Sequence, residues 1–598
     1  MCSYRGISFS ILHTKSATFY TASNGSNLEM VAVAKKEEVS NGGPMHESLE
    51  YEPSGCLEVF LTRIGGSTDD FFKRNRSAIK TISLFILNGL VIGFFFASLY
   101  YWINNGSPQL ELCDGFGSLI AFLGIIYFFL IYFLIVKRFF GEWFERVVWT
   151  KVENFAESLW KFVILRFLVC AGILVMIIGF LVWDTRDASH RLMSLLGVTF
   201  LLLFGFMFSK YPGRVRWRTV GVGLLIQFLF GLLFIRWDTG RYALQCFSDK
   251  VATFLSYGIE GAAFVFGDLL VRNEGVFAFS TLPIIFFFSM LVEVLFFWGA
   301  LQWFVLTLGR LLQAATTTTV CESVIAVGNT FLGMTESILL VKPYLSILTP
   351  SELHLIMSSG YATVSGTILA AYIGFGAEPA HLVTASVMSA PAAIAYSKLL
   401  MPETRRSLTS VDNIQDIDKQ DQSALSAATR GATNGIALVL NIVANLVAFV
   451  SFIAFLNGVL SYCGGMLGNP DLDLEWILGK IFIPMCWMMG VPWEECELVG
   501  SLIGLKTVIN EFVAYQRMGE MKRDGLLSPR AELIATYSLC GFTNPSSAGI
   551  LIGAISAMAP NQRETLSSLA IRAFFAGCGI CFLNACIAGV LMPEGSFG

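Results

Sequence analysis

The sequence predicts an all-α polytopic membrane protein with about 11 transmembrane helices and two re-entrant hairpins. Three observations carry this prediction. Of the 598 residues, 55% are apolar and only 14% are charged, whereas a soluble protein carries about 25% charged residues. Apolar stretches of about 18 to 29 residues recur along the chain, long enough to cross a bilayer. Two further stretches carry polar residues at their centres, in a pattern that occurs once in each half. This composition excludes an ordinary soluble enzyme.

Net charge and cysteine content narrow the function classes further. The net charge of −4 gives no polyanion-binding signature, so no nucleic-acid partner is expected. Many of the 13 cysteines lie in apolar runs, which favours buried thiols over a disulfide framework. Cys578 and Cys581 have neither a second cysteine pair nor histidines nearby, so we expect no metal or redox role there.

The chain opens with a polar segment and continues with candidate spans. Residues 1–79 cannot bury enough apolar surface to fold, which predicts a disordered cytoplasmic tail. The spans that follow cover about 81–103, 117–136, 162–183, 191–209, 219–236 and 278–306. We divide the rest of the chain into an N-terminal three-helix extension at 80–190, a first core half at 191–401, a polar linker at 402–430 and a second core half at 431–598.

Basic residues near the first two spans predict the orientation. They precede the first span and follow the second, and the loop 104–116 between these spans has none: Lys73, Arg74, Arg76 and Lys80 come before, and Lys137, Arg138, Arg146 and Lys151 after. Because basic loops stay on the cytoplasmic side, the N-terminus should be cytoplasmic. The sequon at Asn105 would then face outside, but we expect low glycosylation so close to the membrane.

The first core half contains an interrupted stretch between Thr319 and Lys342. A charged carboxylate at Glu336 would cost at least a few kcal/mol in lipid, so it should face a protein-lined cavity. Gly328 and Gly333 favour a re-entrant hairpin whose tip reaches the middle of the membrane. The next span, about 353–375, is itself broken at 360–367.

The second core half repeats this plan. Residues 497–517 are polar at their centre around Glu511, and the following span, about 531–558, is broken near Gly541 and Pro545. A hairpin with a buried glutamate followed by an interrupted helix therefore occurs twice. This is typical of secondary transporters built from inverted repeats, with the binding sites where half-helices meet.

Three segments resemble signature motifs of the concentrative nucleoside transporters. They read GNTFLGMTE at 328–336, KTVINEFVAY at 506–515 and ATYSLCGFTN at 535–544. The resemblance covers about 190–598, and the three spans before it resemble the extension of animal members. It implies a plasma-membrane homotrimer in the lipid bilayer with its C-terminus extracellular. It also implies a scaffold and a mobile transport domain that imports nucleosides with sodium by an elevator mechanism.

The resemblance also assigns site residues. It implies nucleobase contacts at Met334, Thr335, Glu336 and Ile368, and contacts around the ribose at Glu511, Phe542, Asn544 and Ser547. It implies a sodium site at Asn329, Leu332, Thr363 and Val364. Amide, hydroxyl and main-chain oxygens suit a hard cation, and unwound backbone supplies carbonyls without a second buried charge.

The chain departs from the common family pattern at two places. Met334 replaces a glutamine and so loses an amide contact to the base, because a thioether is only a weak acceptor. Gly333–Met334 with Thr363–Val364 resembles purine-preferring members, so we expect adenosine, guanosine, inosine and uridine as substrates and thymidine and cytidine as poor ones. Ser337–Ile338 stands where many relatives have alanine–proline.

Other readings of the sequence stay open. The symporter could couple to protons or accept a broad range of nucleosides, and composition alone does not exclude a channel. The sequence contains neither a Gly-x-Ser-x-Gly nor a His-Glu-x-x-His motif, so no motif favours an enzyme. The five histidines are scattered, so no metal cluster is evident. Glu293 could be a proton site, although an ion-paired or interfacial structural role is favoured. Lys506 and Arg572 are expected to be structural charge partners.

Overall fold

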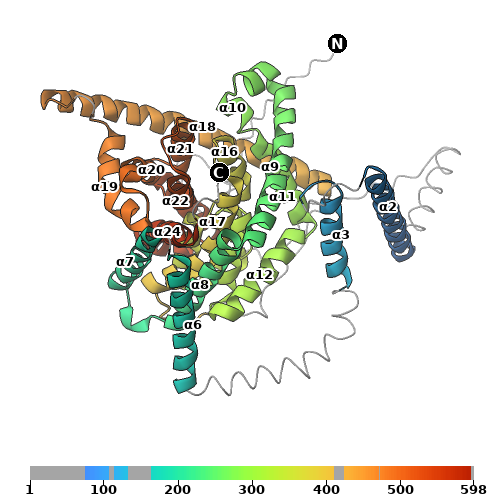
Figure 1. Cartoon of the computed structure of the whole chain (residues 1–598), viewed down its shortest axis with the longest axis horizontal. Coiled ribbons are helices and arrows are strands. Elements are labelled where there is room, and N and C mark those ends of the chain that lie inside the picture. Colours follow the sequence, from blue (N-terminus) through green and yellow to red (C-terminus); the bar gives the residue numbers. More distant parts are fainter. Residues whose placement is uncertain are drawn as a thin grey trace, which may run out of the picture. The chain divides into compact units, whose positions relative to one another are not determined.

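The computed structural model describes residues 75–106, 113–131, 163–186, 188–409, 423–469 and 472–593, and every regular element in them is helical (Figure 1). The all-α prediction is therefore confirmed. Residues 1–74 of the predicted tail and 410–422 of the predicted linker lie outside the described residues. The chain divides into two compact units, 1–108 and 109–598.

The first unit contributes one long helix, α2 (Arg76–Asn104). It begins inside the predicted tail, and its apolar side chains are exposed all round, as in a helix surrounded by lipid. The helix ends at Asn105, whose backbone N–H donates a hydrogen bond of 3.1 Å to the carbonyl of Tyr101. The predicted sequon therefore starts at a helix end.

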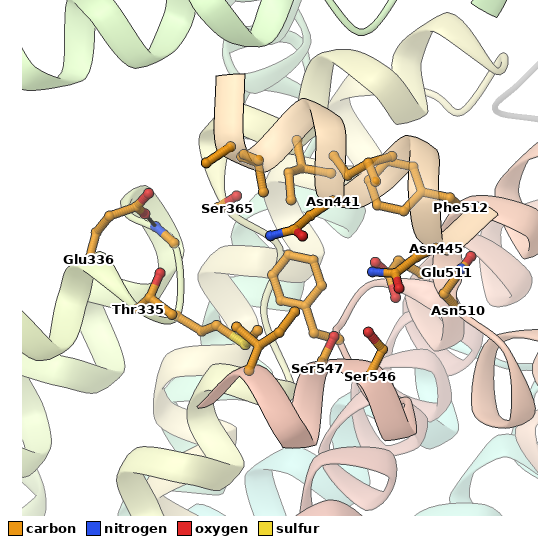
Figure 2. Close-up of a pocket in the computed structure, with 18 of the residues that line it drawn as sticks. Thr335, Glu336, Ser365, Asn441, Asn445, Asn510, Glu511, Phe512, Ser546 and Ser547 are labelled. Carbon is orange, nitrogen blue, oxygen red and sulfur yellow. Dashed lines mark hydrogen bonds between the residues drawn. The ribbon is translucent and has the colours of Figure 1, made fainter. Parts of the chain in front are cut away.

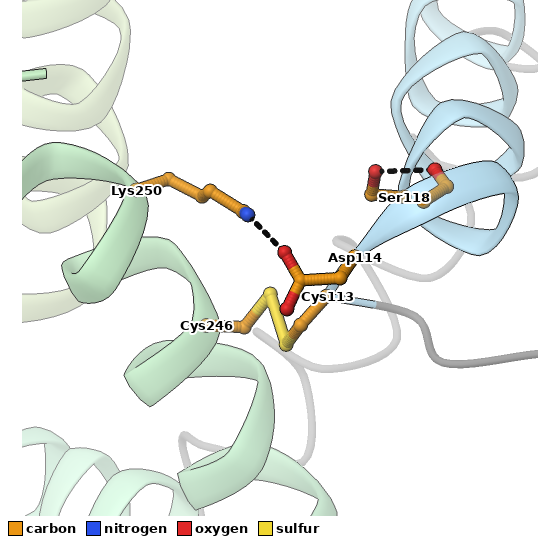
Figure 3. Close-up of a disulfide and its surroundings, with 6 residues drawn as sticks. Cys113, Asp114, Ser118, Cys246 and Lys250 are labelled. Atoms are coloured by element: carbon orange, nitrogen blue, oxygen red, sulfur yellow. Dashed lines mark hydrogen bonds and ion pairs between the residues drawn. A yellow bond between two sulfur atoms is a disulfide. The ribbon is translucent and has the colours of Figure 1, made fainter. Parts of the chain in front are cut away.

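In the second unit, α3 (Gly115–Ile131) is joined covalently to α9 (Asp238–Phe266) (Figure 3). Cys113 and Cys246 form a disulfide with their Cα atoms 5.4 Å apart. Beside it, Lys250 and Asp114 form an ion pair of 2.5 Å. Of the eight free cysteines in the described chain, seven are buried, as predicted, and Cys463 is exposed. The prediction missed this disulfide, because these two cysteines lie in mixed polar segments rather than apolar runs.

The end of α6 (Val163–Asp184) is held by a buried charge cluster. The Asp184 carboxylate pairs with Arg191 at 2.7 Å and with Arg236 at 2.5 Å. Arg191 also donates a hydrogen bond of 2.9 Å to the carbonyl of Val590 near the C-terminus. Breaking this cluster would leave an uncompensated buried charge.

Two helices, α17 (Pro379–Leu400) and α24 (Arg563–Leu591), form the centre of the second unit. They pack against each other and against α7 (Met193–Met207) and α8 (Trp217–Gly231), and most of their side chains are buried. α8 continues into the short helix η5 (Leu232–Arg236). A Cβ at Gly223 would lie 2.8 Å from the carbonyl of Pro391, so this glycine lets α8 approach α17 closely.

The predicted span 278–306 is not one helix. After α10 (Phe277–Ser280), α11 (Ile284–Phe297) ends and α12 (Ala300–Thr316) begins, because Gly299 takes a left-handed φ of 75° between them. The sequence pattern concealed this break because apolar residues continue through it.

α11 packs against α18 (Ala424–Met466), the longest helix of the described chain at 43 residues. A Cβ at Gly431 would lie 2.5 Å from the carbonyl of Ser289, so small residues allow this close packing. α18 begins inside the predicted polar linker, and most of its length is exposed. Figure 1 shows its C-terminal half projecting from the helices around it.

Both halves show a hairpin and an interrupted helix where the sequence predicts them. In the first half these are α13 (Val320–Phe331) with α14 (Glu336–Leu339) and η7 (Lys342–Ile347), then α15 (Pro350–Tyr361) with α16 (Gly366–Gly374). In the second half, after α19 (Leu474–Met489), they are α20 (Cys496–Val508) with α21 (Glu511–Arg523), then α22 (Pro529–Leu539) with α23 (Pro545–Met558).

Length and composition identify six helical segments of the described residues that could cross a membrane: Thr81–Asn104, Ser189–Met207, Trp217–Arg236, Phe277–Phe297, Ala424–Met466 and Pro560–Leu591. The other candidates for the predicted transmembrane helices are α3, α6, α17 and the two interrupted helices. The same criteria also find four shorter apolar helices, Gly115–Phe128, Ala171–Asp184, Val320–Phe331 and Pro545–Met558, which include parts of α3 and α6.

The helices α13 and α15 begin with the same capping arrangement. Thr319 accepts a hydrogen bond from the backbone of Glu322, whose carboxylate accepts one in return from the backbone of Thr319. Thr349 and Glu352 repeat this pattern at α15. Such reciprocal caps satisfy backbone donors that the helix itself leaves unpaired.

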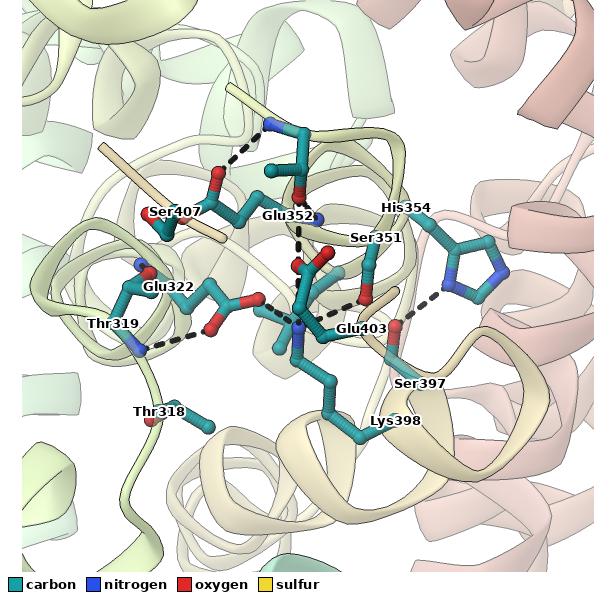
Figure 4. A network of polar contacts seen from close by, with 12 residues as sticks. Thr318, Thr319, Glu322, Ser351, Glu352, His354, Ser397, Lys398, Glu403 and Ser407 are labelled. Atoms are coloured by element: carbon teal, nitrogen blue, oxygen red, sulfur yellow. Dashed lines mark hydrogen bonds and ion pairs between the residues drawn. The ribbon is translucent and has the colours of Figure 1, made fainter. Parts of the chain in front are cut away.

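Lys398, near the end of α17, joins these two helix starts (Figure 4). Its ammonium pairs with Glu322 and donates a hydrogen bond of 2.9 Å to Ser351. Ser407, in the segment after α17, donates one of 2.6 Å to Glu352. The hairpin and the interrupted helix of the first half are therefore anchored together at the ends remote from their breaks.

Candidate functional site

A cavity of about 310 Å³ lies where the two hairpins and the two helix breaks meet, with α11 and α18 on its other side (Figure 2). This volume falls at the lower end of the range of small-molecule sites, about 300 to 1,000 Å³. Its lining includes all eight residues predicted to contact the substrate: Met334, Thr335, Glu336, Ile368, Glu511, Phe542, Asn544 and Ser547. The fold thus brings together residues from four separate segments of the sequence.

Asn544 organises one side of the cavity. Its side-chain nitrogen donates a hydrogen bond of 2.6 Å to Glu511. Its side-chain oxygen accepts one of 2.8 Å from the backbone of Ser547 and so caps α23. One amide therefore ties the carboxylate of the second hairpin to the start of the half-helix that follows.

Several half-helices begin at the cavity. Asn510 caps α21 by accepting a hydrogen bond of 3.0 Å from the backbone of Val513, and Ser365 precedes the first residue of α16. With α23, three helix N-termini meet at this cavity, and all three contribute lining residues. Helix N-termini favour negative or hydrogen-bond-accepting groups. They can therefore orient a polar solute without burying a cationic side chain.

Glu336 lies on the opposite side of the cavity from Glu511 (Figure 2). Its carboxylate accepts a hydrogen bond from the backbone N–H of Gly333. A Cβ at position 333 would collide with that carboxylate, so a larger residue there would force the Glu336 side chain to move. The two acidic groups are thus held apart, each at its own hairpin tip.

The two helix breaks contact each other. A Cβ at Gly541, in the second break, would lie 2.5 Å from the carbonyl of Tyr361, which begins the first break. Phe542, the next residue, lines the cavity. The close approach explains why a residue without a side chain precedes Phe542.

The four predicted sodium ligands are buried beside this cavity and do not line it. The amide nitrogen of Asn329 donates a hydrogen bond of 2.6 Å to Ser359, and its oxygen accepts one from Ser337. The hydroxyl of Thr363 donates one of 2.9 Å to the carbonyl of Ser359. Ser359 therefore contacts two of the predicted ligands, although the sequence analysis did not single it out.

The oxygens of this group suit a monovalent hard cation. Leu332 lies between α13 and α14, and Thr363 and Val364 lie between α15 and α16, so all three stand outside the regular helices. The Asn329 oxygen accepts one hydrogen bond and keeps a second lone pair. Hard cations prefer such neutral oxygen donors.

The cavity also has lining residues that the sequence analysis missed. Asn434, Asn441 and Asn445 of α18 all contribute to it. Their separation by seven and then four residues places them on one helix face, and this pattern within an apolar run could have revealed them. Each of the three lies outside the resembling motifs.

The remaining singled-out charges have structural partners. Glu293 pairs with Arg430 at 2.8 Å and also lines the cavity, in keeping with the favoured ion-paired role. Lys506 donates a hydrogen bond of 2.8 Å to the carbonyl of Ser538, and Arg572 donates one of 2.5 Å to that of Phe208.

Two hairpins and two interrupted helices around a central polar cavity define the class of this protein: a membrane-embedded secondary transporter of the inverted-repeat type. Three family models match the chain and specify that class. They are "Na+ dependent nucleoside transporter N-terminus" at residues 196–269, "Nucleoside recognition" at 278–379 and "Na+ dependent nucleoside transporter C-terminus" at 381–589.

Individual relatives agree with the family models. The chain is 40% identical to "Solute carrier family 28 member 3" of Eptatretus stoutii, over 91% of this chain and 80% of that protein. It is 37% identical to "Sodium/nucleoside cotransporter 2" of Mus musculus, over 96% and 86%. The solved structure of CNTnw in an inward-facing substrate-bound state matches with a TM-score of 0.64 and 38% identity, over 67% of this chain and 98% of that one. Variants of CNTnw match in outward-facing and intermediate states.

The chain therefore belongs to the family of sodium-dependent nucleoside transporters. It is a multi-pass membrane symporter of nucleosides and not an enzyme, and sodium is its coupling ion.

Proposed function

We propose that this protein imports purine nucleosides and uridine together with sodium, and that the 310 Å³ cavity binds the nucleoside. One observation carries the proposal: all eight residues assigned to the substrate by the family resemblance line this single cavity. The decisive experiment is uptake of radiolabelled adenosine into proteoliposomes, with sodium or with choline at fixed pH. Saturable uptake that requires sodium is expected, whereas equal uptake in choline would refute the coupling.

Within the cavity, the hairpin tip with Met334, Thr335 and Glu336, together with Ile368, holds the nucleobase. The ribose lies against Glu511, Asn544 and their neighbours Phe542 and Ser547. A carboxylate accepts hydrogen bonds from sugar hydroxyls, and an amide both donates and accepts. The separation of the two carboxylates across the cavity supports this division (Figure 2).

The purine preference rests on the residues at the base end. Met334 lines the cavity and offers no amide to a pyrimidine carbonyl. Competition for adenosine uptake by a panel of nucleosides tests it. Guanosine, inosine and uridine should compete well, and cytidine and thymidine poorly.

Sodium binds at Asn329, Leu332, Thr363 and Val364, next to the nucleoside. These residues join the first hairpin to the first helix break, and the hairpin also holds the base. A cation there would favour the hairpin position that binds nucleoside, which gives coupled binding a physical basis.

The transport cycle follows an elevator mechanism. The hairpins and interrupted helices form the transport domain, α11 and α18 belong to the scaffold, and the cavity lies between these two groups of helices. The inward-facing, outward-facing and intermediate structures of CNTnw are consistent with such movement. The assembly is a homotrimer, consistent with the extensive exposed apolar surface of α18; crosslinking in native membranes tests the subunit number.

The protein resides in the plasma membrane with its N-terminus cytoplasmic and its C-terminus extracellular. The basic loops support this orientation. The Cys113–Cys246 disulfide supports it independently, because disulfides persist in extracytoplasmic compartments. Cys113 follows the first span and Cys246 follows Arg236, and both positions are outside in this topology.

Proton coupling, a broader nucleoside range and a channel are the alternatives. Uptake driven by a pH gradient without sodium would favour proton coupling, and equal competition by all nucleosides would favour broad specificity. Currents beyond coupled stoichiometry would favour a channel.

A further inference from the structure

Asn441 and Asn445 face the nucleoside cavity from the side opposite the hairpins. Both line the cavity. Figure 2 shows both amides pointing into it from α18, with Asn445 toward the side where Glu511 and Asn510 lie. α18 also packs against α21, the half-helix that starts with Glu511.

Neither amide has its hydrogen-bonding capacity used within the described part of the chain. Asn434, about two helical turns before Asn441, donates a hydrogen bond of 3.2 Å to Glu293. For Asn441 and Asn445, the described residues offer no hydrogen-bond partner. A polar side chain on an apolar membrane helix is costly unless something satisfies it.

The spacing of these asparagines makes them a row. The seven residues from Asn434 to Asn441 bring the helix back to within about 20° of its starting direction. The four residues from Asn441 to Asn445 add a rotation of about 40°. Asn441 and Asn445 are thus neighbours on one face, about 6 Å apart along the helix axis. That separation suits two contacts along one nucleoside.

We propose that Asn441 and Asn445 form a second wall of the nucleoside site, with Asn445 hydrogen-bonding the ribose hydroxyls and Asn441 the polar edge of the base. The inference rests on the proposed function of this cavity. An amide can donate to and accept from a sugar hydroxyl. Since α18 belongs to the scaffold, these contacts form only while the transport domain occupies this position against it. The scaffold thereby adds specificity at one stage of transport.

The test measures equilibrium binding of radiolabelled adenosine and 2′,3′-dideoxyadenosine to the purified full-length protein in saturating sodium. Asn445→Ala should weaken adenosine binding by about 5- to 10-fold and leave dideoxyadenosine binding within twofold. Asn441→Ala should weaken both ligands by a similar factor. Asn457→Ala is the matched control, because Asn457 lies on the same helix and accepts a hydrogen bond of 2.9 Å from Leu474 away from the cavity. It should leave both affinities unchanged.

Adenosine affinities within twofold of wild type in both Asn441→Ala and Asn445→Ala would overturn the proposal. Equal losses for the two ligands in Asn445→Ala would overturn the ribose assignment. If an alanine variant does not purify as a folded protein, Asn445→Ser and Asn441→Ser replace it, with smaller losses of the same pattern expected. Wild-type protein that binds no adenosine in sodium would instead refute the proposed function itself.

Discussion

The side-chain nitrogen of Asn544 lies 2.6 Å from the carboxylate of Glu511, and this hydrogen bond joins the second hairpin to the second helix break. The two residues are 33 positions apart in the sequence. Both side chains are buried, so removing either one leaves the other without its hydrogen-bond partner.

Asn544→Ala should therefore reduce nucleoside transport strongly. It removes a hydrogen bond to a charged group, which contributes about 1.5 to 3 kcal/mol, and a helix cap of about 1 kcal/mol. We expect uptake efficiency to fall by at least about tenfold. Glu511→Gln should abolish uptake. Sodium-dependent adenosine uptake, corrected for the amount of protein at the cell surface, measures both, and normal transport in the two variants would contradict the site assignment.

Asn329→Ala and Thr363→Val should act on sodium rather than on the nucleoside. Both remove a side-chain oxygen donor from the proposed cation site, so the sodium concentration for half-maximal uptake should rise about tenfold or more. Adenosine KM at saturating sodium should change less. Thr507→Val is a matched control, because Thr507 makes the same type of hydroxyl bond, 2.7 Å to Ile503, in the other hairpin. An unchanged sodium dependence in both site variants would place the ion elsewhere.

Met334→Gln should shift selectivity toward pyrimidine nucleosides. The new amide can hydrogen-bond a base edge that a thioether cannot, at about 1 kcal/mol. Cytidine and thymidine should then compete for adenosine uptake about fivefold better than in wild type. Met334→Leu, which adds no amide, should leave the ranking of competitors as it was. A similar shift in both variants would show that size rather than hydrogen bonding decides.

Lys398→Met should destabilise the protein by about 3 to 5 kcal/mol, because it leaves the buried Glu322 without its cation. Lys480→Met is the control. Its pair with Glu497, at 2.6 Å, is solvent-exposed and contributes about 0 to 1 kcal/mol. Thermal unfolding of the purified proteins compares them. Combining Lys398→Met with Glu322→Gln should recover part of the loss, and no recovery would mean that the charge is not the cause.

Local signals were sufficient to predict the breaks and hairpins. At least one glycine, proline or asparagine interrupts the apolar run at each of them, as at Gly541 and Pro545. A transmembrane helix tolerates such residues only where a cavity or partner satisfies the backbone. The motif residues then supplied most of the predicted cavity lining, because each motif spans one break or one hairpin tip, while Ile368 and Ser547 lie outside the motifs.

Long-range partners could not be predicted in this way. The pairing of Asp184 with Arg236, and the contact of Glu293 with Arg430, depend on which helices become neighbours, and no local pattern states that. The spacing of Asn441 and Asn445 puts them on one helix face, but it does not say which cavity that face lines. The end of α11 at Phe297 also escaped notice, since Gly299 alone distinguishes a break from a continuous helix there.

The disulfide between Cys113 and Cys246 closes a ring of chain with a sequence separation of 133 residues. A protease that cuts the backbone anywhere inside that ring would leave the two fragments covalently attached. On a gel without reductant the nicked protein should migrate with the intact chain, and with reductant it should separate into two pieces. Cys246→Ser should remove the difference between the two gels. In the oxidised protein, the integrity of the molecule therefore does not depend on an unbroken backbone between these cysteines.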